Sequence, residues 1–197
     1  MSEKLNEPVV LERFKRGDTS AFKDIVLAYQ DRIYRLCRYM LGDPHNAEDA
    51  AQDTFLKAYQ SLKNFKPDAS LYTWLYRIAV NTCIDYKRKS AFESLFKHTN
   101  NGEDIIAEEQ STEPSPEKLY ESRQMTDALQ KALKKLSQKL RTIIVMKEIE
   151  GLPYEDIARV LDISIGTVKS RISRAREELR DLMKGFTPIE RTNHENR

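Results

Sequence analysis

Short hydroxyl side chains and basic side chains alternate along one stretch near the C-terminal end of the chain. Arginine can donate two parallel hydrogen bonds to a guanine, and lysine can reach bases or phosphates. Serine is short enough to let a helix approach base edges closely. This combination of residue types is suited to reading duplex DNA in the major groove. The candidate DNA-binding residues are Lys169, Ser170, Arg171, Ser173, Arg174 and Arg176.

The stretch that carries these residues has the pattern of an amphipathic helix. Apolar residues recur at steps of three and four positions over 168–182 and define one buried stripe. At about 100° per residue, Ser170 and Ser173 lie nearly opposite that stripe, and Lys169 and Arg174 lie on its two shoulders. The outward face therefore presents short hydroxyls flanked by cations.

A shorter helix is predicted directly in front of this one, over 153–161, with Pro153 in its first turn. Asp162 and Ile163 form the turn, and Ser164 is placed to cap the second helix. Two helices joined by a tight turn form a helix-turn-helix, a motif that binds DNA. The alternative is an ordinary surface helix with solvated charges, and the density of cations on one face argues against it.

A second group of candidate residues occupies one flank of a helix predicted over 70–89. An aromatic ring, two cations and an amide recur there at spacings of three, four and seven residues, in Trp74, Arg77, Asn81 and Arg88. Arginine can hold phosphates, asparagine can read a base edge, and an aromatic ring can stack on an unpaired base. This flank could hold single-stranded nucleic acid. Alternatively, Trp74 belongs to the core and the polar flank is simply solvated.

An acidic patch made of Glu48, Asp49, Gln52 and Asp53 lies in the first turns of a helix predicted over 46–63. The spacing of Asn46 and Asp49 resembles a capping box at the start of that helix. Acidic residues near a helix N-terminus are stabilised by the helix dipole. The patch therefore has two interpretations, a favourable helix start or a contact surface for a basic partner.

The charge of the chain is distributed unevenly, although its net value is only +2. Residues 1–90 carry 15 Lys and Arg against 12 Asp and Glu, residues 91–121 carry 2 against 8, and residues 122–197 carry 16 against 11. Two basic blocks on either side of an acidic segment suit two modules that face nucleic acid, joined by a segment that avoids it.

The periodicity predicts helices only, hence an all-α fold of two small helical domains joined by a flexible acidic linker. Further helices are predicted over 9–15, 20–41, 117–136 and 137–150, the last capped by Ser137 and stopped by Gly151. The expected boundaries are 1–90 for the first domain, 91–116 for the linker, 117–184 for the second domain and 185–197 for a tail.

Several classes of protein and site are excluded. No apolar run approaches the roughly 18 residues of a membrane span, and the first residues lack a signal-peptide core, so we expect a cytoplasmic protein. Cys37 and Cys83 lie in apolar helical patterns and are expected to be buried thiols rather than a disulfide. His45, His98 and His194 have none of the partners of a catalytic triad or metal site. We expect no catalytic residue, metal or cofactor.

Three segments, in this order, resemble the extracytoplasmic-function (ECF) RNA polymerase sigma factors of bacteria, members of the sigma-70 family, and are nearest to the sigma-E type. They are EDAAQDTFLKAY (48–59), YTWLYRIAVNT (72–82), and GLPYEDIA (151–158) followed by GTVKSR (166–171). The resemblance extends over 8–182 and includes the spacing between the segments. It implies a factor that directs core RNA polymerase to promoters and assists their opening, in a stress or envelope response.

The resemblance also implies roles for the candidate residues. The first domain, sigma region 2, would bind core polymerase and the minus-ten promoter element, and the second, sigma region 4, the minus-35 element. An anti-sigma factor, often membrane-anchored, would be a further partner. Asp49, Gln52 and Asp53 would contact polymerase. The six residues of the C-terminal helix would read the minus-35 element. The minus-ten residues would be Ser61, Phe65, Lys66, Tyr72, Trp74, Arg77, Asn81 and Arg88.

Two positions depart from the sigma-E type. Lys169 replaces an arginine and Ser173 replaces an aromatic residue, so the minus-35 preference is expected to differ. The alternative function is a helix-turn-helix regulator that binds duplex DNA as a dimer. A gel shift separates the two, because a dimeric regulator binds promoter duplex alone whereas a sigma factor needs core polymerase. An enzyme is the third class, and no catalytic motif supports it.

Overall fold

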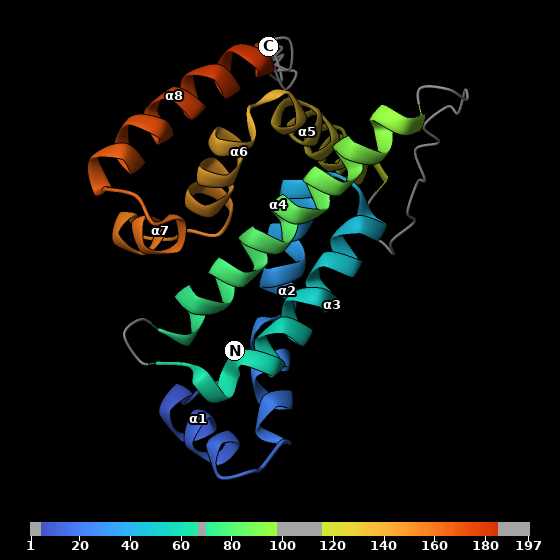
Figure 1. Ribbon diagram of the computed structural model, residues 1–197. Coiled ribbons are helices and arrows are strands. Elements are labelled where there is room, and N and C mark those ends of the chain that lie inside the picture. The colour runs from blue at the N-terminus through green and yellow to red at the C-terminus, as the bar shows by residue number, and fades with distance from the viewer. Residues whose placement is uncertain (1–4, 67–69, 98–115, 185–197) are drawn as a thin grey trace, which may run out of the picture.

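The computed structural model describes residues 5–66, 70–97 and 116–184, and all regular elements in these ranges are helical. The helices form an N-terminal bundle (α1 to α4, blue to green in Figure 1) and a C-terminal bundle (α5 to α8, yellow to red). The bounds are α1 (Glu7–Lys15), α2 (Ala21–Leu41), α3 (Pro44–Ser61), η1 (Leu62–Asn64), α4 (Leu71–Lys97), α5 (Pro116–Lys135), α6 (Gln138–Ile144), η2 (Val145–Ile149), α7 (Tyr154–Leu161) and α8 (Ile165–Met183).

The N-terminal bundle is built around α2, which packs against α1, α3 and α4. Ile25, Tyr29, Ile33 and Met40 are buried at steps of four or seven and form its inward stripe. The buried thiol of Cys37 belongs to the same stripe. Its hydrogen bond with the Cys83 thiol and its burial raise its pKa, which keeps it protonated. Both cysteines are free thiols, as predicted.

Serine side chains cap three of the predicted helix starts. Ser70, Ser137 and Ser164 each accept a hydrogen bond from the backbone N–H three residues on, at 3.1, 3.4 and 3.1 Å. Each bond satisfies one of the donors that a helix start leaves free. These caps agree with the sequence prediction.

The predicted cap of α3 was wrong. Asp43 has extended backbone, and its Oδ1 accepts a hydrogen bond from the Asn46 N–H at 2.8 Å. Pro44 occupies the first helical position, where its fixed φ fits and its missing N–H costs nothing. The helix therefore begins two residues earlier than predicted, and Asn46 lies inside it.

Helix α4 is longer than its periodicity predicted, because it continues to Lys97 rather than ending near Lys89. Residues 90–97 contain neither glycine nor proline, so the chain lacks a local stop signal there. The first residues assigned to the linker are thus helical. Residues 98–115, the greater part of that predicted linker, and the predicted tail over 185–197 lie outside the described residues.

The C-terminal bundle contains the predicted helix-turn-helix, formed by α7 and α8. Asp162 adopts a left-handed conformation (φ 52°) at the end of α7, which turns the chain toward α8. The element before them was predicted as one helix over 137–150. Instead, α6 ends at Ile144 and continues as a π-helical turn, η2, before Gly151 (φ 69°) stops it.

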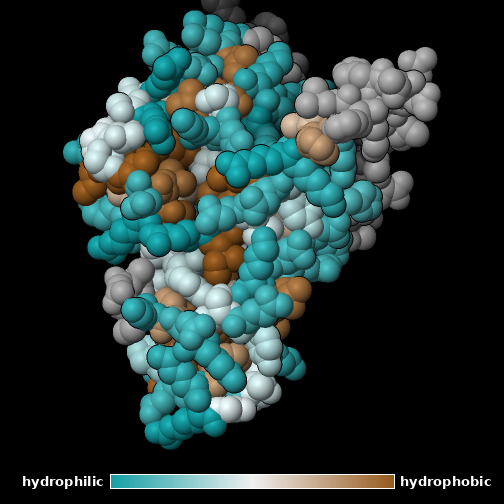
Figure 2. Space-filling model, viewed as in Figure 1, coloured by the Kyte–Doolittle hydropathy of each residue, from teal (hydrophilic) through white to brown (hydrophobic). Residues whose placement is uncertain are grey.

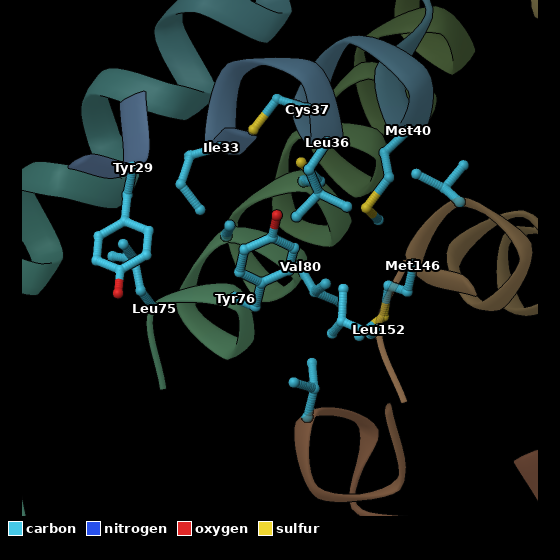
Figure 3. Packing of buried hydrophobic residues seen from close by; sticks show 14 of the residues in the cluster. Tyr29, Ile33, Leu36, Cys37, Met40, Leu75, Tyr76, Val80, Met146 and Leu152 are labelled. Atoms are coloured by element: carbon cyan, nitrogen blue, oxygen red, sulfur yellow. The ribbon is translucent and has the colours of Figure 1, made fainter. Parts of the chain in front are cut away.

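The two bundles share one apolar core. Figure 3 shows Met40 of α2 and Val80 of α4 lying close to Met146 of η2 and Leu152, and all four are buried. In chain order these residues belong to both predicted domains. The structure therefore describes a closed arrangement, in which the bundles lie directly against each other.

Candidate nucleic-acid interface

Helix α8 presents its predicted DNA-reading residues to solvent. Val168, Ile172 and Ala175 are buried on the inner side of the helix. Lys169, Ser170, Ser173 and Arg174 are exposed on the other side. Short side chains at the centre of this face would let the helix backbone approach base edges.

Two arginines of α8 form ion pairs on the surface. Arg174 Nε lies 3.0 Å from Glu178 Oε1. Arg176 Nη2 lies 2.6 Å from Glu148 Oε1, and this contact raises the pKa of Arg176. Exposed pairs of this kind contribute little to stability, so either guanidinium can exchange its carboxylate for another anion. Arg171, in contrast, is partly buried beside the N-terminal bundle.

The flank of α4 that was predicted to hold nucleic acid is largely accessible. Arg77, Asn81 and Arg88 are exposed on it, whereas Trp74 is partly buried. The Trp74 ring lies edge-on to Phe65, with the ring centroids 5.2 Å apart. Phe65 is itself only 5% exposed. Trp74 is therefore the more accessible ring, and Phe65 supports it from the core.

Tyr72 faces the opposite way from this flank. Its hydroxyl accepts a hydrogen bond from Arg32 Nη2 at 2.9 Å, and the Arg32 guanidinium lies 4.5 Å above its ring. Its ring also packs against Tyr76, with centroids 4.3 Å apart. The structure thus separates Tyr72 from Asn81, although both belong to the predicted minus-ten set.

The remaining predicted minus-ten residues precede α4. Lys66 is exposed directly before residues 67–69, which lie outside the described residues. The Ser61 hydroxyl donates to the Lys57 carbonyl at 2.6 Å at the end of α3. On the other side of α4's start, Glu7 Oε2 accepts from the Leu71 N–H at 3.1 Å, and its Oε1 accepts from the Tyr29 hydroxyl at 2.7 Å. Glu7, which the sequence did not single out, thereby joins α1 to the N-terminus of α4.

The acidic patch on α3 divides into free and engaged residues. Glu48, Asp49 and Gln52 are exposed, and Leu56 of the same helix is 56% exposed. Asp53 is partly buried and accepts a hydrogen bond from the Tyr86 hydroxyl at 2.9 Å. Burial and this bond raise the pKa of Tyr86 to about 12. An exposed acidic face with an unpartnered leucine suits a protein contact.

A buried carboxylate between the bundles was not identified from the sequence. The Glu150 side chain is fully buried and lies between α2 and α4. Arg35 donates to both of its oxygens at 2.7 and 3.2 Å, and the Tyr76 hydroxyl donates to Oε2 at 2.5 Å. Arg32 Nε lies 3.7 Å from Oε2. We call these four residues the Glu150 cluster.

A buried guanidinium makes a second connection between the bundles. Arg141, only 5% exposed, donates to the carbonyls of Leu133, Lys134 and Leu136 at the end of α5. It also donates to the Met40 carbonyl near the end of α2 at 3.1 Å. Other charged residues stand close to both in the sequence, Lys139 to Arg141 and Lys147 and Glu148 to Glu150, so no local signal distinguishes the two buried charges.

Candidate residues from both predicted domains meet at one cleft. Arg88 of α4 and Arg171 of α8 line a cavity of about 440 Å³, together with Ile84 and Leu161. Figure 2 shows hydrophobic residues gathered on this face between α8 and α4. Next to it, Arg77 Nη2 donates to the Arg159 carbonyl in α7. The helix-turn-helix thus rests against the proposed single-strand flank.

Among the described residues, no cluster of His, Cys, Asp and Glu has the composition of a metal site. None of the described helices combines the length and apolar character needed to cross a membrane.

Sequence profiles of two conserved regions match the chain. Sigma-70 region 2 matches residues 25–93, and Sigma-70 region 4 matches residues 126–179. The first match covers most of α2 and all of α3, and reaches into α4 as far as residue 93. The second covers the helix-turn-helix and the helices that support it.

Curated relatives match over most of their length. The ECF RNA polymerase sigma factor SigW of Bacillus subtilis is 39% identical over 173 residues, which cover 86% of this chain and 92% of the relative. The ECF RNA polymerase sigma-E factor of Escherichia coli K12 is 38% identical over 186 residues, which cover 91% of this chain and 95% of that relative.

Solved structures show the same arrangement of helices. The sigma factor RpoE of Bartonella quintana, solved in complex with the anti-sigma factor NepR, has a TM-score of 0.67 at 28% identity, over 84% of this chain and 98% of that one. CnrH, solved with the cytosolic domain of CnrY, has a TM-score of 0.68 at 23% identity, over 92% of this chain and 99% of that one. This likeness supports the fold alone. The chain therefore belongs to the ECF sigma factors of the sigma-70 family.

Proposed function

We propose that the chain directs core RNA polymerase to promoters by binding two DNA elements, one with each bundle. The observation that carries this proposal is the pairing of two accessible polar faces in one chain. One is the hydroxyl and cation face of α8, and the other is the Arg77–Asn81 flank of α4. The two faces lie within the segments that match Sigma-70 region 4 and Sigma-70 region 2, which supports this proposal.

The minus-35 element is read by α8 in this proposal. Ser170 and Ser173 lie against base edges, Lys169 and Arg174 contact bases or phosphates at the two sides of the helix, and Arg176 contacts phosphate. Arg171 joins them once the cleft that it lines together with Arg88 of α4 opens. Lys169 and Ser173, which depart from the sigma-E type, set the preference of this chain.

The minus-ten element is held by the flank of α4. Asn81 bonds the edge of an unpaired base, Trp74 offers a stacking surface, and Arg77 and Arg88 hold the backbone. Capturing an extruded base offsets an unstacking cost of a few kcal/mol and so favours strand opening. Lys66 and Ser61 border the same site, with Phe65 supporting the Trp74 ring.

Core polymerase is the partner of the acidic face of α3. Asp49 and Gln52, with the exposed Leu56, form the contact, and Asp53 orients it through Tyr86. The chain performs no reaction of its own and acts in the cytoplasm, where polymerase is found. An anti-sigma factor is a further partner, supported by the RpoE–NepR complex.

Run-off transcription with purified core polymerase tests the proposed function. The chain should restore initiation at a promoter from its own genome and should fail to shift the same duplex in the absence of core. Tight binding of duplex DNA by the chain alone, with no run-off product, would instead support a dimeric regulator.

A further inference from the structure

We propose that the Glu150 cluster holds the free protein closed and inactive, and that engagement with polymerase and promoter must break it. This inference rests on the proposed function, because it concerns access to the two DNA-binding faces. The carboxylate comes from the C-terminal bundle, and Arg32, Arg35 and Tyr76 come from the N-terminal bundle. The cluster therefore exists only while the bundles are together.

The chemistry of the cluster is complementary. The two guanidiniums and one phenol hydroxyl converge on a carboxylate that has no exposed surface. The two-point contact with Arg35 has the geometry of a bidentate pair, which is stronger and more directional than a single bond. Its hydrogen bond to Glu150 raises the pKa of Arg35, and burial raises that of Tyr76. Both donors keep their protons at neutral pH.

Two neighbouring contacts close the same interface. Arg77, a candidate minus-ten residue, donates to the Arg159 carbonyl of α7. Arg141 donates to the Met40 carbonyl at 3.1 Å. The hydrogen bond to the Arg159 carbonyl engages the side chain of Arg77, which belongs to the candidate DNA-binding flank. In the closed form, part of the minus-ten surface is thus covered by the helix-turn-helix.

The closed form is too short to span a promoter. Asn81 is one helical turn, about 6 Å, from Arg77. Lys169 is ten residues from Arg159, so chain length limits that separation to about 36 Å. The hydrogen bond between Arg77 and Arg159 links these two segments. The distance between Asn81 and Lys169 in the closed form is therefore at most about 50 Å. Elements centred about 25 base pairs apart are separated by about 85 Å of duplex. Both can be bound only after the bundles separate.

A buried ion pair is a suitable device for such a switch. Burial of the carboxylate costs desolvation energy that its partners largely offset, so the intact ion pair adds little net stability, whereas removal of one partner leaves the others buried and uncompensated. On opening, water replaces the partners of Glu150, Arg32 and Arg35. Opening also exposes part of the shared apolar core, and hydration of the released charged groups offsets part of that cost.

Fluorescence energy transfer between the bundles tests the proposal on the full chain. Dyes are attached at Lys15→Cys and Glu177→Cys, both exposed positions, while the buried Cys37 and Cys83 stay unlabelled. The test variant is Glu150→Gln, which removes the charge and keeps the shape. The matched control is Asp181→Asn, which removes an ion pair made within the C-terminal bundle, to Lys184.

Glu150→Gln should raise the ratio of open to closed protein about tenfold, the order expected for loss of one charged hydrogen bond. It should also lower the concentration needed for half-maximal run-off transcription. Asp181→Asn should change neither quantity. The charge swap Arg35→Glu with Glu150→Arg should restore energy transfer relative to Arg35→Glu alone, and circular dichroism verifies that each variant is folded.

Energy transfer that is equal in the wild type and in Glu150→Gln would overturn the proposal. An opened Glu150→Gln variant that needs as much protein as the wild type for transcription would also overturn it. Absence of run-off product from every form, the wild type included, would contradict the proposed function instead. The energy-transfer result would still decide whether the cluster holds the bundles together.

Discussion

Helices α8 and α4 both carry candidate DNA-binding residues, but they are buried in different ways. Helix α8 rests on the C-terminal bundle along one stripe and leaves its opposite face to solvent. Helix α4 packs against α2 and α3 in its own bundle and against α7 in the other. The accessible flank of α4 lies between these contacts, and Trp74 on that flank is partly buried.

This difference separates two designs for reading nucleic acid. A duplex groove needs a protruding ridge, and one stripe of apolar contacts suffices to hold it. An extruded base needs a pocket with a supported floor, so the site must be assembled from several packed elements. Substitutions on the open face of α8 should therefore affect DNA affinity more than folding, whereas substitutions at the buried positions that support the flank of α4 should affect both.

Leu75→Ala should give the largest effect. Leu75 is fully buried in α4, and its truncation leaves a cavity among three helices, so we expect a loss of about 3 kcal/mol in the free energy of unfolding. Ser173→Ala on the open face of α8 should cost less than about 0.5 kcal/mol. Urea denaturation followed by circular dichroism measures both. Equal losses would contradict the contrast between the helices.

Arg174→Ala should weaken binding to the minus-35 element by about 1–3 kcal/mol while leaving the fold intact. Arg180→Ala, an exposed arginine further along the same helix, is the control and should have little effect. Footprinting of the polymerase complex at increasing protein concentration gives the affinities. An unchanged minus-35 footprint for Arg174→Ala would remove it from the reading face.

Asn81→Ala should impair promoter opening by about 1 kcal/mol, the value of one hydrogen bond to an unpaired base. Because Asn81 is exposed, stability and polymerase binding should be unaffected. Permanganate reactivity of unpaired thymines reports opening, and co-purification with core reports binding. Normal reactivity would place base capture elsewhere on the N-terminal bundle.

Asp49→Lys should lower the affinity for core polymerase by up to about 1 kcal/mol, as expected for an exposed charge at an interface rim. The effect should weaken with added salt. Glu48→Lys, a charge reversal at the adjacent exposed residue, is the comparison. A pull-down of core showing no change for either variant would leave the acidic face without its proposed partner.

Lys87 should give a pH dependence of stability, with no effect on DNA or polymerase binding expected from its place between the bundles. Burial, with the nearby Arg141 charge, lowers its pKa from 10.5 to about 8. Between these values the unfolded chain binds more protons, so stability should rise with pH across the window. Comparing melting temperatures at about pH 7 and about pH 9.5 for wild type and Lys87→Met isolates this contribution. Identical profiles would contradict it.

Much of this structure could be predicted from local sequence patterns. The helix-turn-helix, the serine caps and the exposed face of α8 depend on residues a few positions apart, and these were confirmed. Helical structure was also correctly predicted for the regular elements described here, whereas the start of α3, the end of α4 and the π-helical turn η2 were not. Asp43 and Asn46 are both good caps, and only the neighbouring Pro44 decides between them.

The interface between the bundles could not be predicted in this way. Glu150 and Arg35 are 115 positions apart, and nothing in the sequence of either signals the other. Tyr72 is a different case: it lies nine residues before Asn81, and at about 100° per residue this spacing already indicates opposite faces of the helix. Only its partner, Arg32 of α2, could not be predicted. Phe65 is a similar case, since an aromatic before a loop can equally stack on a base or support a tryptophan.

The apolar core shared by the two bundles has a consequence for the protein before it meets polymerase. Met40, Val80, Met146 and Leu152 are covered by one another rather than by a partner. Separated bundles would each expose part of this surface, which invites aggregation and cleavage by proteases. The closed form should therefore resist aggregation and proteolysis before it binds polymerase. The half-life of the protein in the cell should shorten whenever the bundles are held apart without polymerase.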